Sequence, residues 1–239
     1  MKPAIIMQDV QGRHNADPST SERLHKNGQW KKQRIVCVIP AGDSIPARVA
    51  LSHWNLIFPP NQGVCRILAQ GMEVGYAYSQ TIEMVLAHPD LKDFEYLLTL
   101  EHDNLPAPDG VLMLIEALEE HPEFAAVSGL YFTKGEGGCA QIWGDPKDPM
   151  VNFRPQVPQP DTVQECCGIG MGFALWRMST FKDDKLPKPW FKTLDGREGK
   201  GVGTQDLTFW SEARKYGYRC AVDTRVKVGH FDAGTGVTW

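Results

Sequence analysis

Two carboxylate side chains follow directly on the apolar segment Phe94–Leu100. They are Glu101 and Asp103, with His102 between them. Alternate residues of a strand or tight turn point to the same side, so both carboxylates are expected to face one crevice. Their mutual repulsion is relieved by a divalent cation, and Mg²⁺ or Mn²⁺ commonly links protein carboxylates to substrate phosphates. The alternative is an acidic surface turn, which often follows a strand.

Two further side chains are candidates for the same chemistry, and each also has a simple structural explanation. His230 follows a short apolar segment, and its imidazole completes a mixed nitrogen and oxygen metal site only if the fold brings it near Asp103. Asp206 lies in the first turn of a predicted helix, where the helix dipole favours an acid. Its functional alternative is a general base that takes a proton from an acceptor hydroxyl.

A glycine-rich turn and an aromatic pair are candidates for contacts with a substrate. The turn contains Gly170, Met171 and Gly172 and lets a substrate approach the backbone closely. It has neither the lysine of a P-loop nor the following helix of a dinucleotide-binding fingerprint. Trp190 and Phe191 form either an aromatic wall for a sugar ring or part of the core.

The elements that must hold these side chains alternate between strand and helix character. In chain order, the patterns predict a strand at 35–39, a helix at 73–87, a strand at 94–100, a helix that begins after Asp109, a strand at 125–132, a long loop region at 133–165, a strand at 173–177, a helix at 204–216 and two short strands at 218–223 and 225–229. This order is typical of an α/β domain with a mostly parallel central sheet. In such sheets, ligands bind beyond the carboxyl ends of the strands.

Composition limits the classes of protein to which the chain can belong. Its 239 residues, 42% of them hydrophobic, suffice for one full-sized domain with an apolar core. The net charge of −4 lacks the basic excess of a dedicated nucleic-acid-binding domain. No apolar run approaches the roughly 18 residues that span a bilayer, and no signal peptide is recognisable, so a cytoplasmic protein without a transmembrane segment is expected. Residues 1–33 are polar and aperiodic and are predicted to be an arm or extension of one domain at 34–239.

The order of these features resembles that of the GT-A glycosyltransferases, and most closely the family 2-like enzymes. The matching segments, between residues 35 and 239, are Pro40–Gly42, Gly75–Ser79, Leu97–Asp103, Gly168–Gly172, Trp190-Phe191, Thr204–Asp206 and Gly229-His230. The resemblance implies a single Rossmann-like, nucleotide-sugar-binding domain. It also implies an enzyme that moves a sugar from a nucleotide-diphosphate sugar to an acceptor hydroxyl.

Within this resemblance, Glu101 and Asp103 take the place of the D-x-D motif, which holds the donor diphosphate through Mn²⁺ or Mg²⁺. Glutamate replaces the first aspartate, so Asp103 and His230 are the expected metal ligands, and Glu101 contacts metal, ribose or neither. Gln205 and Asp206 take the place of the catalytic Glu-Asp pair, with Asp206 as the base of an inverting displacement. A retaining enzyme on the same fold is the alternative.

The resemblance also implies contacts to the donor and the acceptor. Pro40 and Ala41 end the first strand beside the nucleotide. Ser79 takes the place of the asparagine in an A-x-N segment, and Arg66 is expected to meet the base or a phosphate. Gln205, the glycine-rich turn and the aromatic pair are expected on the side of the sugar and acceptor.

Two other functions remain open. A nucleotidyltransferase also uses an α/β sheet and carboxylate-bound metal, but the turn after the first strand, Ala41-Gly42-Asp43-Ser44, lacks the basic residue that usually holds a triphosphate. A non-catalytic binding module on the same nucleotide-sugar fold is the other alternative, because the family's acids are replaced at Glu101 and Gln205.

The sequence leaves the acceptor undecided among a glycan, a protein, a small molecule and a hydroxymethylated DNA base. Basic residues in the N-terminal arm keep the DNA acceptor open, and they serve equally well as solubilising charge. They are Arg23, Lys26, Lys31, Lys32 and Arg34.

Overall fold

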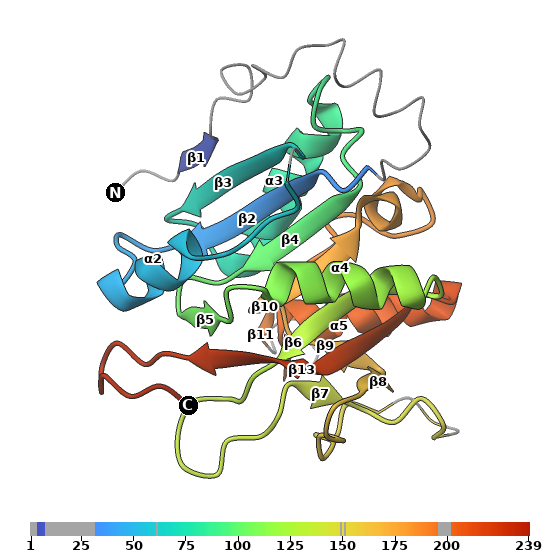
Figure 1. Ribbon diagram of the computed structural model, residues 1–239. Helices are drawn as coiled ribbons and strands as arrows, with labels where there is room; N and C mark the ends of the chain where they lie inside the picture. The colour runs from blue at the N-terminus through green and yellow to red at the C-terminus, as the bar shows by residue number, and fades with distance from the viewer. Residues whose placement is uncertain (1–3, 8–31, 61, 149, 151, 196–201) are drawn as a thin grey trace.

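A nine-stranded sheet lies at the centre of the part of the chain that the structure describes (Figure 1). The structure is a computed structural model, and it describes residues 4–7, 32–60, 62–148, 150, 152–195 and 202–239. The strands of the sheet are β1 (Ala4–Met7), β2 (Ile35–Ala41), β3 (Val64–Gln70), β4 (Tyr96–Leu100), β5 (Asn104–Pro106), β6 (Phe124–Leu130), β8 (Val163–Cys166), β10 (Phe173–Arg177) and β13 (Arg219–His230). Their spatial order is β1-β3-β2-β4-β10-β6-β13-β5, and β8 pairs with β13.

Five of these strands, β3, β2, β4, β6 and β13, run in the same direction. β2 pairs in parallel with β3 and β4, and β6 pairs in parallel with β13. The antiparallel strand β10 joins the two groups by pairing with both β4 and β6. The predicted α/β class with a mostly parallel central sheet is therefore confirmed. Because β4 and β6 point the same way, their carboxyl ends lie at the same edge of the sheet.

Helices cover both faces of this sheet. They are α2 (Ala47–Trp54), α3 (Val74–Ala87), α4 (Gly110–Glu120) and α5 (Gln205–Ala213). On one face, α3 and α5 contribute Tyr78 and Trp210 to a core that includes Trp176 of β10. On the other face, α4 contributes Leu114 to a core that includes Leu98 of β4. Each core takes alternate strand residues, because successive side chains of a strand point to opposite faces. Among the described residues, no helix is long and apolar enough to cross a membrane.

Short elements complete the fold. β7 (Ile142–Trp143) pairs with β9 (Gly168–Ile169), and β11 (Leu194–Asp195) pairs with β12 (Val202–Gly203). Two 3₁₀ turns, η2 (Met178–Lys182) and η4 (Arg214–Tyr216), follow β10 and α5. The region predicted as a loop at 133–165 therefore contains β7 and β8. The two predicted closing strands form one strand, β13, whose register shifts between Asp223 and Lys227.

The sequence patterns do not predict α2 or β3. α2 buries only Val49 and His53, so it has no continuous apolar stripe. β3 has Arg66 in its centre, and its residues alternate between buried and half-buried positions. Each element is specified by its neighbours in space more than by its own composition.

Part of the predicted N-terminal arm joins the sheet. β1 pairs antiparallel with β3 and forms the edge of the sheet. Residues 8–31, and with them three of the five basic residues of the arm, lie outside the described residues. Arg34 forms an ion pair with Glu95 at 2.7 Å. The division of the chain at residue 33 stays a prediction.

His53 links α2 to β5, the strand that follows the two carboxylates. Its imidazole is buried, and Nε2 lies 3.0 Å from the backbone oxygen of Asn104. A carbonyl only accepts hydrogen bonds, so Nε2–H is the donor. Burial lowers the pKa of His53 to about 4, although the bond to Asn104 opposes this shift.

Replacing His53 with glutamine is expected to reduce the acid sensitivity of the fold. The pKa of His53 lies below its usual 6.5 in the folded chain, so the unfolded chain binds the proton first and stability is lost as the pH falls from 6.5 towards 4. The free energy of unfolding of the wild type should fall by on the order of 2 kcal/mol more than that of His53→Gln between neutral pH and about pH 4.5. Urea unfolding at the two pH values measures the difference.

His121→Gln is the matched control, because that imidazole is 38% exposed and pairs with Glu123 at the surface. It should keep the pH dependence of the wild type. The same pH dependence in His53→Gln would contradict the assignment to His53.

Candidate active site

The pairing of β5 with the end of β13 brings two predicted ligands together. His230 lies opposite Asn104 in this antiparallel ladder, and the Phe231 N–H donates to the Asp103 carbonyl at 2.7 Å. On the other side, the Glu101 N–H donates to the Gly172 carbonyl at 3.0 Å. Asp103 and His230, which are distant in the sequence, therefore lie side by side where β4 ends.

Two side chains meet one oxygen of Asp103. Nζ of Lys134 lies 2.6 Å from Asp103 Oδ2, and Nε2 of His230 lies 3.4 Å from the same oxygen. The second oxygen, Oδ1, is buried and has no hydrogen-bond partner among the described residues. Burial raises the pKa of Asp103, but His230 and Lys134 together outweigh burial and hold it well below the usual range. Asp103 is therefore a fixed negative charge at neutral pH.

The ring of His230 is held in one orientation. Its Nδ1–H donates to the Phe132 carbonyl at 2.7 Å, and its edge packs against the ring of Tyr131, with centroids 5.7 Å apart and an interplanar angle of 90°. In the neutral ring, this hydrogen bond leaves the lone pair on Nε2. Nε2 lies 3.4 Å from Asp103 Oδ2, so a proton or a metal cation held between these two atoms joins the imidazole to the carboxylate.

Glu101 lies in the same electrostatic environment. Its pKa is raised to about 8 by burial and by the charges of Asp103 and Asp206, and the charge of Lys134 opposes this shift. Charges act strongly on one another only over short distances, since solvent and salt screen them beyond that. Asp103 and Asp206 therefore both lie within electrostatic reach of Glu101.

Asp206 lies in the first turn of α5 and is 8% exposed. Its Oδ1 accepts a hydrogen bond from the Leu207 N–H at 2.8 Å. Burial raises its pKa, and the Thr204 hydroxyl and the Leu207 N–H oppose this. A carboxylate with a raised pKa binds a proton more readily, which suits a general base. The capping bond and the role of a base are compatible, because one oxygen is enough to accept a proton.

Among the described residues, no three His, Cys, Asp or Glu side chains are grouped closely enough to hold a metal ion by themselves. Asp103 and His230 form a pair, and Glu101 does not join them as a third ligand. A cation at this site therefore needs ligands from a bound substrate or from water.

Packing against the site explains the glycine-rich turn. A Cβ on Gly170 would lie 2.1 Å from the Tyr131 hydroxyl, and one on Gly172 would lie 2.6 Å from Asn104 Oδ1. The Gly172 N–H donates to the Tyr131 hydroxyl at 2.9 Å, and Met171 is buried. The two glycines thus allow Tyr131 and Asn104 to approach the backbone. A contact of this turn with the sugar stays a prediction.

The residues predicted to contact the donor lie in different surroundings. Pro40 and Ala41 are buried at the carboxyl end of β2. The guanidinium of Arg66 lies 4.7 Å from the ring centroid of Phe58, so the protein itself provides it with a partner. The roles of these three residues in donor binding stay predictions.

Ser79 supports the segment that contains the aromatic pair. It is fully buried, and its hydroxyl donates to the Phe191 carbonyl at 3.2 Å and accepts from the Phe191 N–H at 3.0 Å. Both bonds hold the chain at Phe191 against α3. A contact of Ser79 with the nucleotide stays a prediction, and its burial does not favour it.

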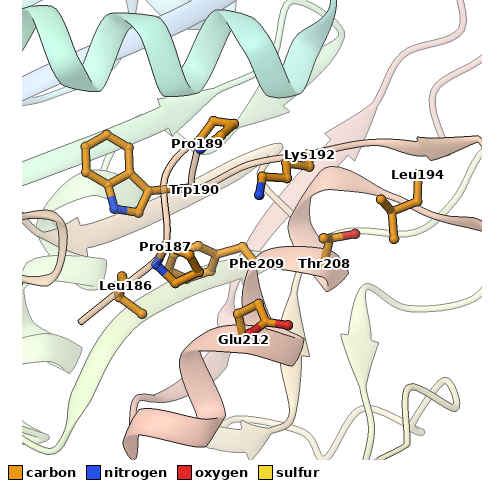
Figure 2. A pocket seen from close by; sticks show the side chains of 9 residues that line it. All are labelled: Leu186, Pro187, Pro189, Trp190, Lys192, Leu194, Thr208, Phe209 and Glu212. Carbon is orange, nitrogen blue, oxygen red and sulfur yellow. The ribbon is translucent and has the colours of Figure 1, made fainter. Parts of the chain in front are cut away.

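A pocket of about 570 Å³ lies beside α5 (Figure 2). Its walls are Leu186, Pro187, Pro189, Trp190, Lys192, Leu194, Thr208, Phe209 and Glu212. Thr208 is one helical turn along α5 from Gln205, the half-buried residue predicted on the acceptor side. The pocket is therefore close to the start of α5, but none of the three acids lines it.

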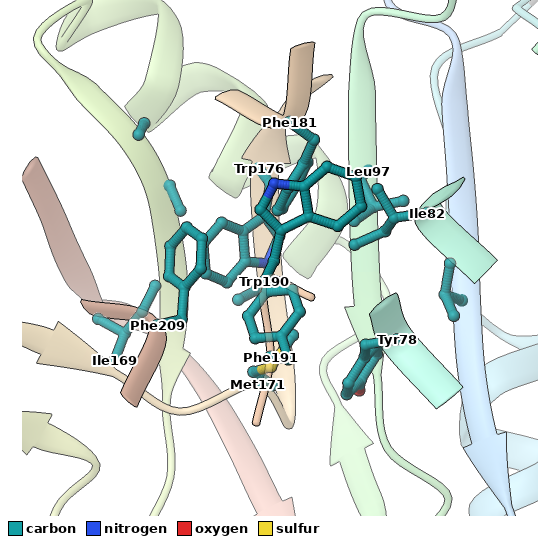
Figure 3. Close-up of a cluster of buried hydrophobic side chains, with 14 of the residues drawn as sticks. Tyr78, Ile82, Leu97, Ile169, Met171, Trp176, Phe181, Trp190, Phe191 and Phe209 are labelled. Atoms are coloured by element: carbon teal, nitrogen blue, oxygen red, sulfur yellow. The ribbon is translucent and has the colours of Figure 1, made fainter. Parts of the chain in front are cut away.

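The aromatic pair belongs to a cluster of buried rings (Figure 3). Trp190 is 3% exposed and Phe191 is 1% exposed, and Phe191 stacks on Phe209 with ring centroids 4.8 Å apart. Trp176 packs edge to face against Phe191, with centroids 5.8 Å apart, and stacks on Trp210 of α5 at 5.3 Å. Of the two interpretations of the pair, these contacts support the core. Only Trp190 also borders the pocket.

Three residues of the site have no role in the predictions from sequence: Lys134, Tyr131 and Asn104. Lys134 follows the predicted strand at 125–132, at the same edge of the sheet as the two carboxylates. The rule that directs attention to the ends of strands would have found it if basic residues had been included. Tyr131 and Asn104 give no comparable signal, because their roles depend on glycines that are distant in the sequence.

Comparison with known proteins identifies the fold and no family. No protein-family model and no curated protein sequence matches the chain. Among solved structures, the chain is similar to A197 from STIV, with 18% identity over 83% of this chain and 86% of that chain and a TM-score of 0.59. The chain has the GT-A fold. It also matches residues 1–349 of S. aureus TarS, at 13% identity over 79% of this chain and 57% of that chain, with a TM-score of 0.49.

In this GT-A fold, Gly170→Ala is expected to destabilise the chain by about 2 kcal/mol, because overpacking a filled site costs about 1–3 kcal/mol. The added methyl group meets the Tyr131 hydroxyl, so Tyr131→Phe should remove part of the penalty. Urea unfolding of the two single variants and the double variant should give a coupling of about 1 kcal/mol.

Gly42→Ala is the control, because a Cβ at that position has no atom within 4 Å. It should leave the free energy of unfolding nearly unchanged. Strictly additive effects of Gly170→Ala and Tyr131→Phe would show that the glycine is not required by this contact.

Proposed function

We propose that the protein is a glycosyltransferase that moves a sugar from a nucleotide-diphosphate sugar to an acceptor hydroxyl. The observation that carries the proposal is the grouping of Asp103, His230, Glu101 and Asp206 at one edge of a GT-A sheet. Ligands of α/β sheets bind beyond the carboxyl ends of the strands, and this group lies there. Sugar-nucleotide transfer needs a group that neutralises the departing diphosphate and a base for the acceptor, and we assign these roles to a cation at Asp103 and His230 and to Asp206.

The pair Asp103 and His230 fits Mn²⁺ or Mg²⁺. Asp103 Oδ2 and His230 Nε2 are 3.4 Å apart, close to the ~3 Å that separates neighbouring ligands of an octahedral ion with bonds near 2.1 Å. The Nδ1–H of His230 donates to a backbone carbonyl, which is the usual support for a metal-binding imidazole. When bound, the cation would neutralise charge on the leaving diphosphate.

Asp206 is the proposed base. The acceptor hydroxyl attacks the anomeric carbon of the donor, its proton passes to the Asp206 carboxylate, and the bond from that carbon to the diphosphate oxygen breaks with its electron pair. Attack from the side opposite the leaving group inverts the anomeric centre. The buried position of Asp206 strengthens its basicity and keeps bulk water away from the proton.

Lys134 gives some support to the second candidate, a nucleotidyltransferase. Those enzymes need a basic, glycine-rich loop near the carboxylates, and Lys134-Gly135-Glu136-Gly137-Gly138 is such a loop, although it follows β6. An assay that offers both nucleotide-diphosphate sugars and nucleoside triphosphates with sugar phosphates separates the two reactions. Turnover of neither would favour the non-catalytic binding module.

Asp206→Asn is expected to reduce sugar transfer, or hydrolysis of the donor without an acceptor, by about 10²-fold or more, because a general base contributes about 10²–10⁴-fold. Affinity for the nucleotide should stay within a few-fold of the wild type, since the amide fills the same space. Release of nucleoside diphosphate and a binding titration measure the two quantities.

Asp109→Asn provides the same chemical change at an exposed carboxylate next to α4, and it should keep full activity. If Asp206→Asn lost nucleotide affinity and turnover together, Asp206 would be a structural residue of the donor site.

Mn²⁺ is expected to be required for stabilisation by a nucleoside diphosphate. In a thermal-shift assay with UDP, GDP, ADP, CDP and dTDP, one nucleotide should raise the Tm with Mn²⁺ and not with EDTA. Asp103→Asn and His230→Ala should each abolish this shift, because each removes one of the two protein ligands. A full shift in either variant would remove that residue from the proposed metal site.

A further inference from the structure

Lys134 lies at the tip of a turn whose base is fixed by hydrogen bonds. Phe132 and Ala140 form an antiparallel bridge, and the Thr133 N–H donates to the Cys139 carbonyl at 2.9 Å. Beyond this base, Gly135 and Gly137 have φ angles of 99° and 77°, in the left-handed region that favours glycine. Lys134 therefore lies between the hydrogen-bonded base of the turn and its two glycines.

The space around the tip is open. A Cβ on Gly135 or on Gly137 would meet no atom within 4 Å. The side chain of Lys134 is 33% exposed, while Asp103, its partner, is 21% exposed. The ammonium therefore lies at the border between the carboxylate cluster and solvent, where a ligand has access to it.

Lys134 occupies the oxygen that a metal ion would use. Its Nζ lies 2.6 Å from Asp103 Oδ2, the oxygen that also faces His230 Nε2. Two cations do not share one carboxylate oxygen at contact distance without strong repulsion. A divalent cation bound by Asp103 and His230 must therefore displace the ammonium from this position.

A phosphate group of the donor is the expected new partner of the displaced Lys134 ammonium. The other acidic side chains near Asp103 are Glu101 and Asp206, and the donor diphosphate would add negative charge at the same edge of the sheet. Lysine binds phosphate as a compact point charge, and charge-assisted hydrogen bonds of this kind are among the strong ones.

We propose that Lys134 binds the donor diphosphate: it neutralises Asp103 in the free protein and moves to the phosphate oxygens when a divalent cation takes the Asp103 oxygen. This inference rests on the proposed function, since it assumes a diphosphate donor. It also accounts for Gly135 and Gly137, because the turn that contains them allows Lys134 to change partner while the Phe132–Ala140 bridge stays fixed.

The test measures the affinities of Lys134→Met for Mn²⁺ and for a nucleoside diphosphate, which the proposal predicts to change in opposite directions. Without nucleotide, Mn²⁺ should bind about fivefold more tightly than to the wild type, because its competitor for Asp103 is gone. With Mn²⁺ present, the nucleoside diphosphate of the panel that stabilises the wild type should bind about tenfold more weakly, because one charged contact is lost. Isothermal titration gives both values, and neither requires turnover.

Two control variants test whether the change in affinity depends on the charge and the position of Lys134. Lys134→Arg retains the charge and should keep nucleotide affinity within about threefold of the wild type. Lys147→Met removes an exposed lysine from the same region and should change neither affinity. Thermal unfolding confirms that each variant is folded.

An unchanged nucleotide affinity in Lys134→Met would overturn the inference, and so would a loss of both affinities, which would indicate a structural role. The proposed function fails separately: in that case no nucleoside diphosphate of the panel binds even the wild type in the presence of Mn²⁺.

Discussion

The backbone ladder between β5 and the end of β13 is the interaction on which the site depends. It places His230 opposite Asn104 and ties the Asp103 carbonyl to the Phe231 N–H. Because backbone hydrogen bonds fix these positions, the imidazole and the carboxylate are not needed to hold the two strands together. Lys134 reaches Asp103 from the segment after β6, and Asp206, at the start of α5, lies within electrostatic reach of Glu101.

A concentration of like charge is the second constraint on the structure. Asp103 and Asp206 lie within electrostatic reach of Glu101, and such a group is unfavourable unless protons or cations accompany it. The fold meets this requirement with Lys134, which pairs with the acid whose charge is most strongly held. A cluster of acids kept close to a single lysine is better suited to receiving a cationic ligand than to stabilising the empty fold.

The sequence predicts those parts of the site that a pattern of a few neighbouring residues encodes, and it does not predict contacts between distant segments. An apolar run followed by acids marks the end of a strand, so Glu101 and Asp103 were identifiable from a few residues. The proximity of His230 came from a resemblance, because no local pattern encodes that β13 reaches β5. Lys134 also follows a predicted strand, but a single lysine after a strand is common at protein surfaces and indicates no particular chemistry. The aromatic pair stayed ambiguous, since burial of a ring is decided by neighbours such as Phe209 that are distant in the sequence.

The short segment 131–134 has one more consequence. Phe132 fixes the imidazole through its carbonyl, and Lys134 lies two residues further along the same backbone. Under the proposed function, a ligand that draws Lys134 outward also acts on the Phe132 carbonyl that orients His230, so binding at one point is expected to alter affinity at the other. Coupling between two ligands is reciprocal: the factor by which the anion changes the affinity for the cation equals the factor by which the cation changes the affinity for the anion. Under the proposed function, the cation and the donor diphosphate are therefore expected to change each other's affinity by the same factor.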